Sequence, residues 1–265
     1  MTNLPCELLD HIVDLLHDSQ TPLKNCCLVS KSWVARTRRH LFAAVLFRTG
    51  GRLASWEETF PDPSISPACY TKVLIIRCPY VVTDVDAETD VGRLIGTFSG
   101  VERLELGGGD LHARGWERTF SLFHAFSPVV KSLRANFSSF PFQHFSRLAL
   151  TFPLLEDLTM INCHDVAQIY RDVSGGSSTV VQSPSLPTFA GSLELLLRGG
   201  MRHTVDWLLS LPNGIHFRKL TLSFFREEDV SWTTELVERC SRTLEFLDVT
   251  CNLLGTFTER LGLHR

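Results

Sequence analysis

The sequence has no long hydrophobic run and no strong excess of charge of one sign, and its first residues do not predict a secretory leader. The longest apolar run, LFAAVLF at 41–47, has seven residues, whereas a helix needs roughly 20 to span a bilayer. Lysine and arginine number 26 against 29 aspartates and glutamates, so the net charge of −3 carries no electrostatic signature of nucleic-acid or membrane binding. The first ten residues lack the basic and apolar regions of a signal peptide. These absences predict a cytoplasmic or nuclear protein that contacts neither nucleic acid nor membrane.

Eight cysteines are present, but their spacing suits neither a zinc site nor a disulfide framework. They lie at 6, 26, 27, 69, 78, 163, 240 and 251, with no Cys-x2-Cys pair and no histidine pair at zinc-finger spacing. In a reducing compartment such cysteines behave as small core hydrophobes. We therefore predict neither a metal nor a cofactor.

Catalytic motifs are missing as well. The chain contains no G-x-S-x-G nucleophile turn and no H-E-x-x-H zinc-protease motif. Its ten histidines are scattered, and none has an evident nucleophile beside it in the sequence. A hydrolase or transferase is the least favoured interpretation, because it requires an acid, a base and a nucleophile that converge in one pocket.

The first 47 residues carry more apolar side chains than three short helices can bury among themselves. Residues 4–17, LPCELLDHIVDLLH, place large aliphatic residues at spacings of three and four, in an arc wider than a one-sided helical stripe. Pro5 suits the first position of this helix, and Thr21-Pro22 gives the same start signal for a second helix. Ser30 is the predicted N-cap of a third, from Lys31 to about Leu41. The surplus apolar surface must meet the rest of the chain or a partner.

These segments resemble an F-box. LPxELxxxIxxxL at 4–16, LxxCxLVSxxW at 23–33 and RxxLF at 38–42 follow the family pattern in order and spacing, and the resemblance covers about residues 3–47. It implies docking on the Skp-type adaptor of a cullin-RING ubiquitin ligase, with the rest of the chain holding a substrate. The implied adaptor-facing residues are Leu4, Pro5, Leu8, Ile12, Val29 and Trp33, with Glu7 at the rim. Alternatively the apolar residues only pack the helices together, which we favour for Leu9, Val13 and Leu23.

The third helix of this segment is expected to turn Trp33 inward. Its arginines, Arg36, Arg38 and Arg39, are expected to face outward into solvent.

The remaining residues contain a degenerate repeat of one short strand and one amphipathic helix. Seven fragments, from KVLIIRC at 72–78 to LEFLDVTCN at 244–252, share a pattern of alternating apolar residues. One leucine from each fragment gives intervals of 30, 29, 25, 37, 25 and 27 residues. The leucines taken as equivalent are Leu74, Leu104, Leu133, Leu158, Leu195, Leu220 and Leu247. AAVLF at 43–47 is a candidate eighth strand, with Leu46 in the equivalent position.

A period of about 25–30 residues predicts an α/β solenoid of leucine-rich repeats with a curved parallel sheet. The predicted organisation is an F-box at 1–47, a linker helix with a Pro-rich turn at 48–71, and the repeats at 72–265. The linker followed by a strand also resembles the expanded fungal family of F-box proteins with degenerate repeats. Residues 254–265 show no clear polar cap, which leaves open whether the array is complete.

In such a solenoid, the strand side chains that flank the buried leucines point out of the concave face. They carry both signs of charge and a few apolar groups, which suits a protein or peptide surface better than a phosphate backbone. The predicted target-binding residues are Arg77, Arg103, Glu105, Arg134, Asp157, Glu194, Arg198, Lys219 and Asp248.

Residues and resemblance together predict a non-catalytic, substrate-recognition subunit of an SCF-type (Skp–cullin–F-box) ubiquitin ligase. Such a subunit supplies proximity between a target and a conjugating enzyme, and it performs no covalent chemistry. The alternative is a scaffold that binds partners without ubiquitin ligation. The sequence does not identify the target.

Overall fold

The computed structural model describes residues 5–48, 50–77, 94–108, 129–137, 142–162, 186–196, 202–224, 229–253 and 257–264, together with Phe123. The helices are α1 (Cys6–Leu15), α2 (Gln20–Val29), α3 (Lys31–Leu41), α4 (Gly50–Thr59), the 3-10 helix η1 (Pro67–Tyr70), α7 (Phe142–Leu150), α8 (Arg202–Leu209) and α9 (Asp229–Cys240). The strands are β1 (Ala44–Phe47), β2 (Val73–Ile76), β3 (Arg103–Gly108), β4 (Ser132–Phe137), β5 (Asp157–Ile161), β6 (Ser192–Leu196), β7 (Lys219–Phe224), β8 (Phe246–Leu253) and β9 (Phe257–His264).

Three short helices open the described chain as predicted, but two of them start at other residues. Pro5 lies just before α1 in an extended conformation, with ψ of 142°, and not in its first turn. The second helix, α2, begins at Gln20, so Thr21 does not cap it and Pro22 falls inside its first turn. Pro22 is tolerated there because the first backbone N–H groups of a helix have no partner within the helix.

The start of α3 is as predicted. Ser30 precedes it in an extended conformation, and its Oγ accepts a hydrogen bond from the backbone N–H of Ser32 at 3.3 Å. This contact satisfies one of the free donors at the helix start. Measured by length and apolar character, no helix among the described residues could pass through a bilayer.

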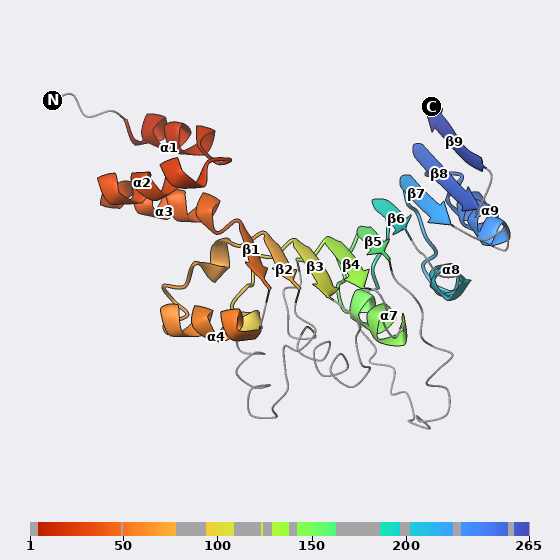
Figure 1. Cartoon of the computed structure of the whole chain (residues 1–265), viewed down its shortest axis with the longest axis horizontal. Coiled ribbons are helices and arrows are strands. Elements are labelled where there is room, and N and C mark those ends of the chain that lie inside the picture. Colours follow the sequence, from red (N-terminus) through yellow and green to blue (C-terminus); the bar gives the residue numbers. More distant parts are fainter. Residues whose placement is uncertain are drawn as a thin grey trace, which may run out of the picture.

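The nine described strands form one sheet whose spatial order follows the chain from β1 to β9. Strands β1 to β8 pair in parallel, and β9, a strand not predicted, pairs antiparallel with β8. Figure 1 shows the strands as a row bent into an arc, with α4, α7, α8 and α9 on its outer side. The predicted α/β class with a parallel sheet is confirmed. We call the side of the sheet that faces away from these four helices the open face.

The strand register confirms most of the predicted leucine alignment and corrects it at two places. Leu158 pairs with Leu193 and not with Leu195, and Val45 rather than Leu46 pairs with Leu74. The first error shifts the strand by two residues and keeps both leucines buried, so the hydrophobic pattern cannot detect it. The second shifts by one residue and exchanges the two faces of β1.

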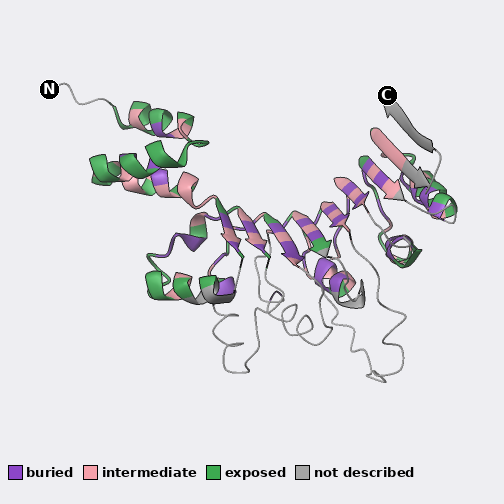
Figure 2. Cartoon of the chain, in the orientation of Figure 1, coloured by how far each residue is buried: buried purple, intermediate pink, exposed green. Residues whose placement is uncertain are grey.

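The core lies on the helix side of the sheet, where alternate strand residues are buried (Figure 2). Leu74, Leu104 and Leu133 are fully buried, and each packs between the equivalent residues of its neighbouring strands. A second layer of buried aromatic side chains covers this ladder. It consists of Phe98, Phe123, Phe145, Phe152, Phe189 and Phe217.

An aromatic cluster joins the three-helix segment to the first strands. The ring of Phe42, just after α3, meets Trp56 of α4 edge-on at a centroid distance of 5.8 Å. Trp56 also contacts Phe47 of β1 at 5.7 Å and Phe98, which precedes β3, at 5.4 Å. Aromatic pairs at these distances add stabilisation beyond the area that they bury. The cluster therefore fixes the end of α3 against the sheet.

The cysteines bear out the predicted core role only in part. Cys26 and Cys240 are buried free thiols, and burial raises the pKa of Cys240 to about 11. Cys6 and Cys69 are exposed, so the prediction is wrong for these two. Cys78 and Cys163 lie outside the described residues.

Asp157 ties β5 to β6 across a long connection. Its Oδ1 accepts hydrogen bonds from the backbone N–H of Ser192 at 2.6 Å and from the Ser192 hydroxyl at 2.7 Å. Gly191 lies directly beside this carboxylate, and a Cβ placed on Gly191 would stand 2.3 Å from Asp157 Oδ1. Only glycine leaves room for the contact.

We predict that Gly191→Ala lowers the free energy of unfolding by about 1–3 kcal/mol, because the added methyl group displaces the Asp157 carboxylate. Chemical denaturation followed by circular dichroism measures the change. Gly96→Ala is the matched control, since a Cβ at Gly96 meets nothing within 4 Å. That control should be neutral or stabilising by up to about 1 kcal/mol. Equal stability of the Gly191 variant and the wild type would contradict the close packing.

Candidate functional site

In the N-terminal segment, α1 and α2 pack against α3. The shared interior of the three helices holds Val13, Leu23, Cys26 and Thr37. Val13 and Leu23 are each 1% exposed, which confirms the packing role predicted for them. The interior of this unit is small, and most of the remaining apolar residues of α1 and α2 lie outside it.

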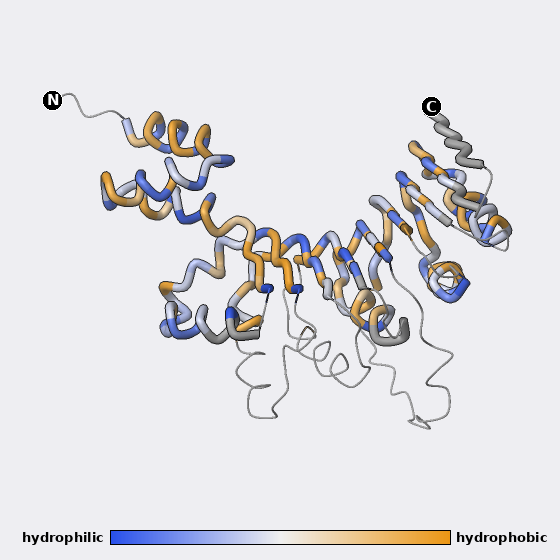
Figure 3. Tube along the Cα trace, viewed as in Figure 1, coloured by the Kyte–Doolittle hydropathy of each residue, from blue (hydrophilic) through white to orange (hydrophobic). Residues whose placement is uncertain are grey.

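Five large apolar side chains on α1 and α2 face solvent. Leu8, Ile12, Leu15, Leu28 and Val29 are between 43% (Ile12) and 86% (Leu28) exposed, and we call these five residues the apolar surface. They are five of the eight large hydrophobic side chains exposed among the described residues. Helix α1 is largely exposed in Figure 2 and largely hydrophobic in Figure 3. Because contiguous exposed apolar patches are typical of interaction sites, these five residues are the first candidate surface.

The residues of α1 within this surface share one helical face. Leu8, Ile12 and Leu15 follow at spacings of four and three, which places them in one row along the helix. Leu28 and Val29 end α2, just before the cap Ser30. The prediction missed Leu15 and Leu28, although the i+7 spacing from Leu8 to Leu15 was a usable signal.

The other predicted adaptor-facing residues have different surroundings. Pro5 and Glu7 are exposed at the start of α1, and Trp33 of α3 is half-buried. The pKa of the Glu7 carboxyl is lowered, mainly by a hydrogen bond from the backbone N–H of Glu7 itself and to a smaller extent by one from the Cys6 side chain. Glu7 therefore stays ionised beside the apolar row. Leu4 lies outside the described residues.

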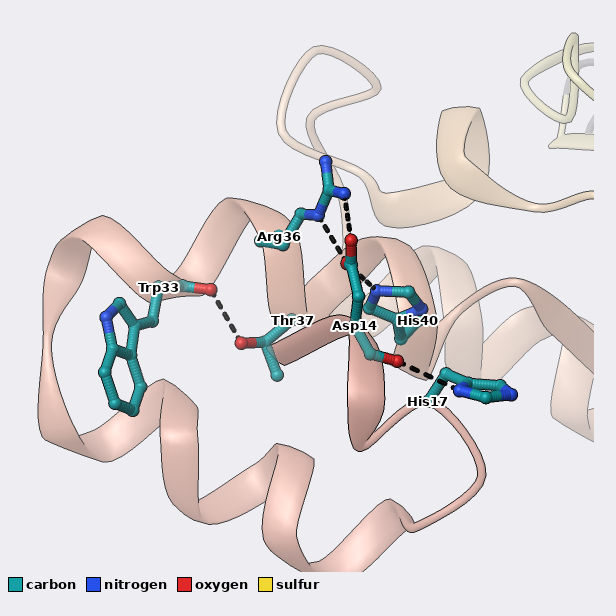
Figure 4. A network of polar contacts seen from close by, with 6 residues as sticks. All are labelled: Asp14, His17, Trp33, Arg36, Thr37 and His40. Carbon is teal, nitrogen blue, oxygen red and sulfur yellow. Dashed lines mark hydrogen bonds and ion pairs between the residues drawn. The ribbon is translucent and has the colours of Figure 1, made fainter. Parts of the chain in front are cut away.

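A polar network fastens α1 to α3 on another side of the unit (Figure 4). Asp14 Oδ1 accepts a hydrogen bond from Arg36 Nε at 2.6 Å, and a second guanidinium nitrogen of Arg36 pairs with Asp14 Oδ2. His40 Nε2 lies 2.8 Å from Asp14 Oδ1. Hydrogen bonds from Arg36 and then from His40 hold the pKa of Asp14 well below its ordinary value. Arg36 was expected to face outward into solvent, and that expectation is wrong because its side chain is half-buried and paired with Asp14.

We predict that Asp14→Asn weakens the attachment of α1 at neutral pH, because the amide cannot form the charged, two-point contact with Arg36. The pKa of Asp14 is lowered by folding, so its stabilisation is complete above the ordinary value of about 3.9 and is lost as the pH falls below it. The difference in unfolding free energy between wild type and variant should narrow below about pH 4.

Denaturation of both proteins at several pH values between 7 and 3 measures this difference. Asp10→Asn is the control, because Asp10 is an exposed aspartate of the same helix whose effect on Arg36 is only coulombic and smaller than that of Asp14. It should change stability less at neutral pH. A variant as stable as the wild type at pH 7 would contradict the assigned role of Asp14.

The second candidate surface is the open face of the sheet. Consecutive strand pairings align one row of residues across it. The row runs through Ile75, Glu105, Arg134, Thr159, Glu194, Thr221 and Asp248. Four of the nine predicted target-binding residues thus lie in one row. Glu105 and Arg134 are direct neighbours at the strand spacing of about 4.8 Å, whereas a threonine strand position separates Arg134 from Glu194 and another separates Glu194 from Asp248.

The remaining predicted residues lie outside this row. Arg103 and Lys219 are exposed at the starts of β3 and β7, and Arg77 is exposed just after β2. Asp157 is engaged by Ser192, so its carboxylate has a structural role. Arg198 lies outside the described residues.

A shallow hollow of about 210 Å³ opens on this face over strands β2, β3 and β4. Its lining includes Ile75, Arg77, Glu105, Gly107, Arg134 and Asn136. The prediction for this face included the three charged residues and Asn136 but not Gly107, because a glycine has no side chain and its place in the hollow depends on the register of three strands. Over the described ranges, no group of three or more histidine, cysteine, aspartate or glutamate side chains could hold a metal ion.

Comparison with protein-family models, with curated proteins and with solved structures gives no match to this chain. The functional argument therefore depends on the two surfaces and on the sequence pattern.

Proposed function

We propose that this chain is the substrate-recognition subunit of an SCF-type ubiquitin ligase. In this proposal α1, α2 and α3 are an F-box that binds a Skp-type adaptor, and the strands and helices that follow are degenerate leucine-rich repeats that hold a protein target. The observation that carries the proposal is the apolar surface of α1 and α2, which occurs in the segment that resembles an F-box.

The exposure of this surface favours docking over internal packing. Leu8, Ile12 and Val29 were predicted to face an adaptor, and all three are exposed, whereas the packing residues Val13 and Leu23 are buried. This difference supports docking for Leu8, Ile12 and Val29, whereas Leu9 and Trp33 are both half-buried. Burial of an exposed leucine or isoleucine in an interface contributes roughly 1.5–3 kcal/mol.

The sheet supports the repeat part of the proposal. Parallel strands in sequence order, each burying alternate residues against its neighbours, are the arrangement that stacked repeats of one strand and one helix produce. The curvature visible in Figure 1 places the open face on the inner side of the arc. A second candidate function, a scaffold that binds partners without ubiquitin ligation, needs the same two surfaces.

We predict that the double substitution Leu8→Ser and Ile12→Ser reduces co-purification with a recombinant Skp-type adaptor by at least about tenfold, since it removes two central apolar contacts. The unfolding transition should change little, because both side chains are exposed. Leu154→Ser is the matched control, a leucine 48% exposed outside the three helices. Wild-type binding by the double variant would refute the docking assignment.

Ubiquitin ligation is tested by adding cullin, a RING subunit and a conjugating enzyme to the wild-type complex. A ligase subunit should bring cullin into the complex and promote ubiquitin transfer to a bound protein. Retention of the adaptor without cullin or transfer would favour the scaffold.

A further inference from the structure

The hollow on the open face is built by side chains from three neighbouring strands. Arg77 follows β2, Glu105 and Gly107 lie on β3, and Arg134 and Asn136 lie on β4. Glu105 pairs in register with Arg134, and Gly107 pairs with Asn136. The two arginines therefore stand on strands about 10 Å apart, on either side of β3. Their side chains are long enough to reach a group placed between them.

Gly107 keeps the space between these side chains open. A Cβ at this position would lie 3.2 Å from the backbone oxygen of Asn136 and 3.7 Å from Cγ of Arg77. Any larger side chain would fill the hollow from its floor. Because Gly107 has no side chain, the hollow stays open, and its walls include the side chains of Arg77, Arg134, Asn136 and Glu105.

The charged groups in this hollow are available to a ligand. Within the described part of the chain, no ion pair or side-chain hydrogen bond engages the guanidinium group of Arg77 or of Arg134. By contrast, Arg36 in the N-terminal helices is paired with Asp14, and Lys72 pairs with Glu102 at 2.7 Å. Two arginines and one glutamate give the lining a net charge of +1.

We propose that this hollow binds the carboxylate of an aspartate or glutamate side chain in a peptide segment that lies across the open face. A guanidinium group presents a pair of N–H donors that matches the two oxygens of a carboxylate, and the Asn136 amide can donate a further hydrogen bond. The proposal rests on the proposed function, because it specifies which feature of a protein target the repeats would hold.

Glu105 favours a carboxylate over a phosphate. A phosphorylated side chain carries a charge of about −1.5 to −2 at neutral pH. Glu105 repels either group, but the repulsion grows with the charge of the ligand, and a single negative charge already balances the net +1 of the lining. Glu105 itself can accept a hydrogen bond from a backbone N–H of the bound segment.

A peptide library with one fixed central residue and random flanking residues tests this assignment. Four sub-libraries, fixed as glutamate, glutamine, phosphoserine or lysine, are exposed to the purified full-length chain. We expect the glutamate sub-library to be retained about tenfold more than the glutamine one, as for a charged hydrogen bond. Arg134→Gln and Arg77→Gln should each remove most of that preference, while Glu105→Gln should raise retention of phosphoserine. Unfolding midpoints of all variants verify that they are folded.

Arg242→Gln is the matched control, because Arg242 is an exposed arginine after α9, outside the hollow and outside the predicted target-binding residues. It should leave the preference for glutamate intact. Equal retention of glutamate and glutamine, a preference for phosphoserine in the wild type, or an equal loss in Arg242→Gln would each overturn the proposal.

Adaptor co-purification of the wild type and of Arg134→Gln separates this inference from the proposed function. If the adaptor binds both proteins but the preference for glutamate is absent, the hollow is not the site and the ligase proposal stands. If the preference is present but no adaptor binds, the chain recognises acidic peptides outside a ligase.

Discussion

From β2 to β8, each strand pairs in parallel with the strand before it, and the rest of the structure depends on this pairing. A single strand with its helix cannot bury its own leucines, because their partners come from the preceding and the following strand. Leu74, Leu104 and Leu133 are fully buried for that reason, and the phenylalanine layer covers them from the helix side. The same pairing lines up the side chains of the opposite side in continuous rows, so the open face is a direct product of the core.

The aromatic cluster at α4 connects the sheet to the N-terminal helices. Trp56 contacts Phe42 after α3, Phe47 on β1 and Phe98 before β3, so one side chain joins the three-helix unit, the first strand and the packed interior. Arg39 of α3 also lies over the ring of Tyr70 in η1, at 6.0 Å. Among the described elements, α1 and α2 each contact α3, and α3 in turn contacts η1 before the sheet. The outer sides of α1 and α2 remain uncovered.

Sequence patterns predicted the strands well and their register less well. Alternating apolar residues identify strands because side chains alternate between faces, and β1 to β8 were all expected on that basis. Leu193 and Leu195 point to the same side, so hydrophobicity alone could not choose between them. Arg36 and Asp14 are 22 residues apart, and Gly107 and Asn136 meet only through strand pairing. Contacts of this kind leave no local signal, which is why the sequence could not predict them.

The division of apolar residues in α1 gives the clearest link from sequence to function. Val13 is buried where α1 packs against α3. Its neighbour Asp14 stabilises the same helix contact through hydrogen bonds with Arg36 and His40. With the helix fastened by one buried side chain and one ionised one, Leu8, Ile12 and Leu15 are not needed for folding of the unit. Keeping three large aliphatic side chains exposed costs solubility and gives the isolated chain no stability. Such a row supports the proposed docking on a partner protein, and this support does not depend on the proposal for the open face.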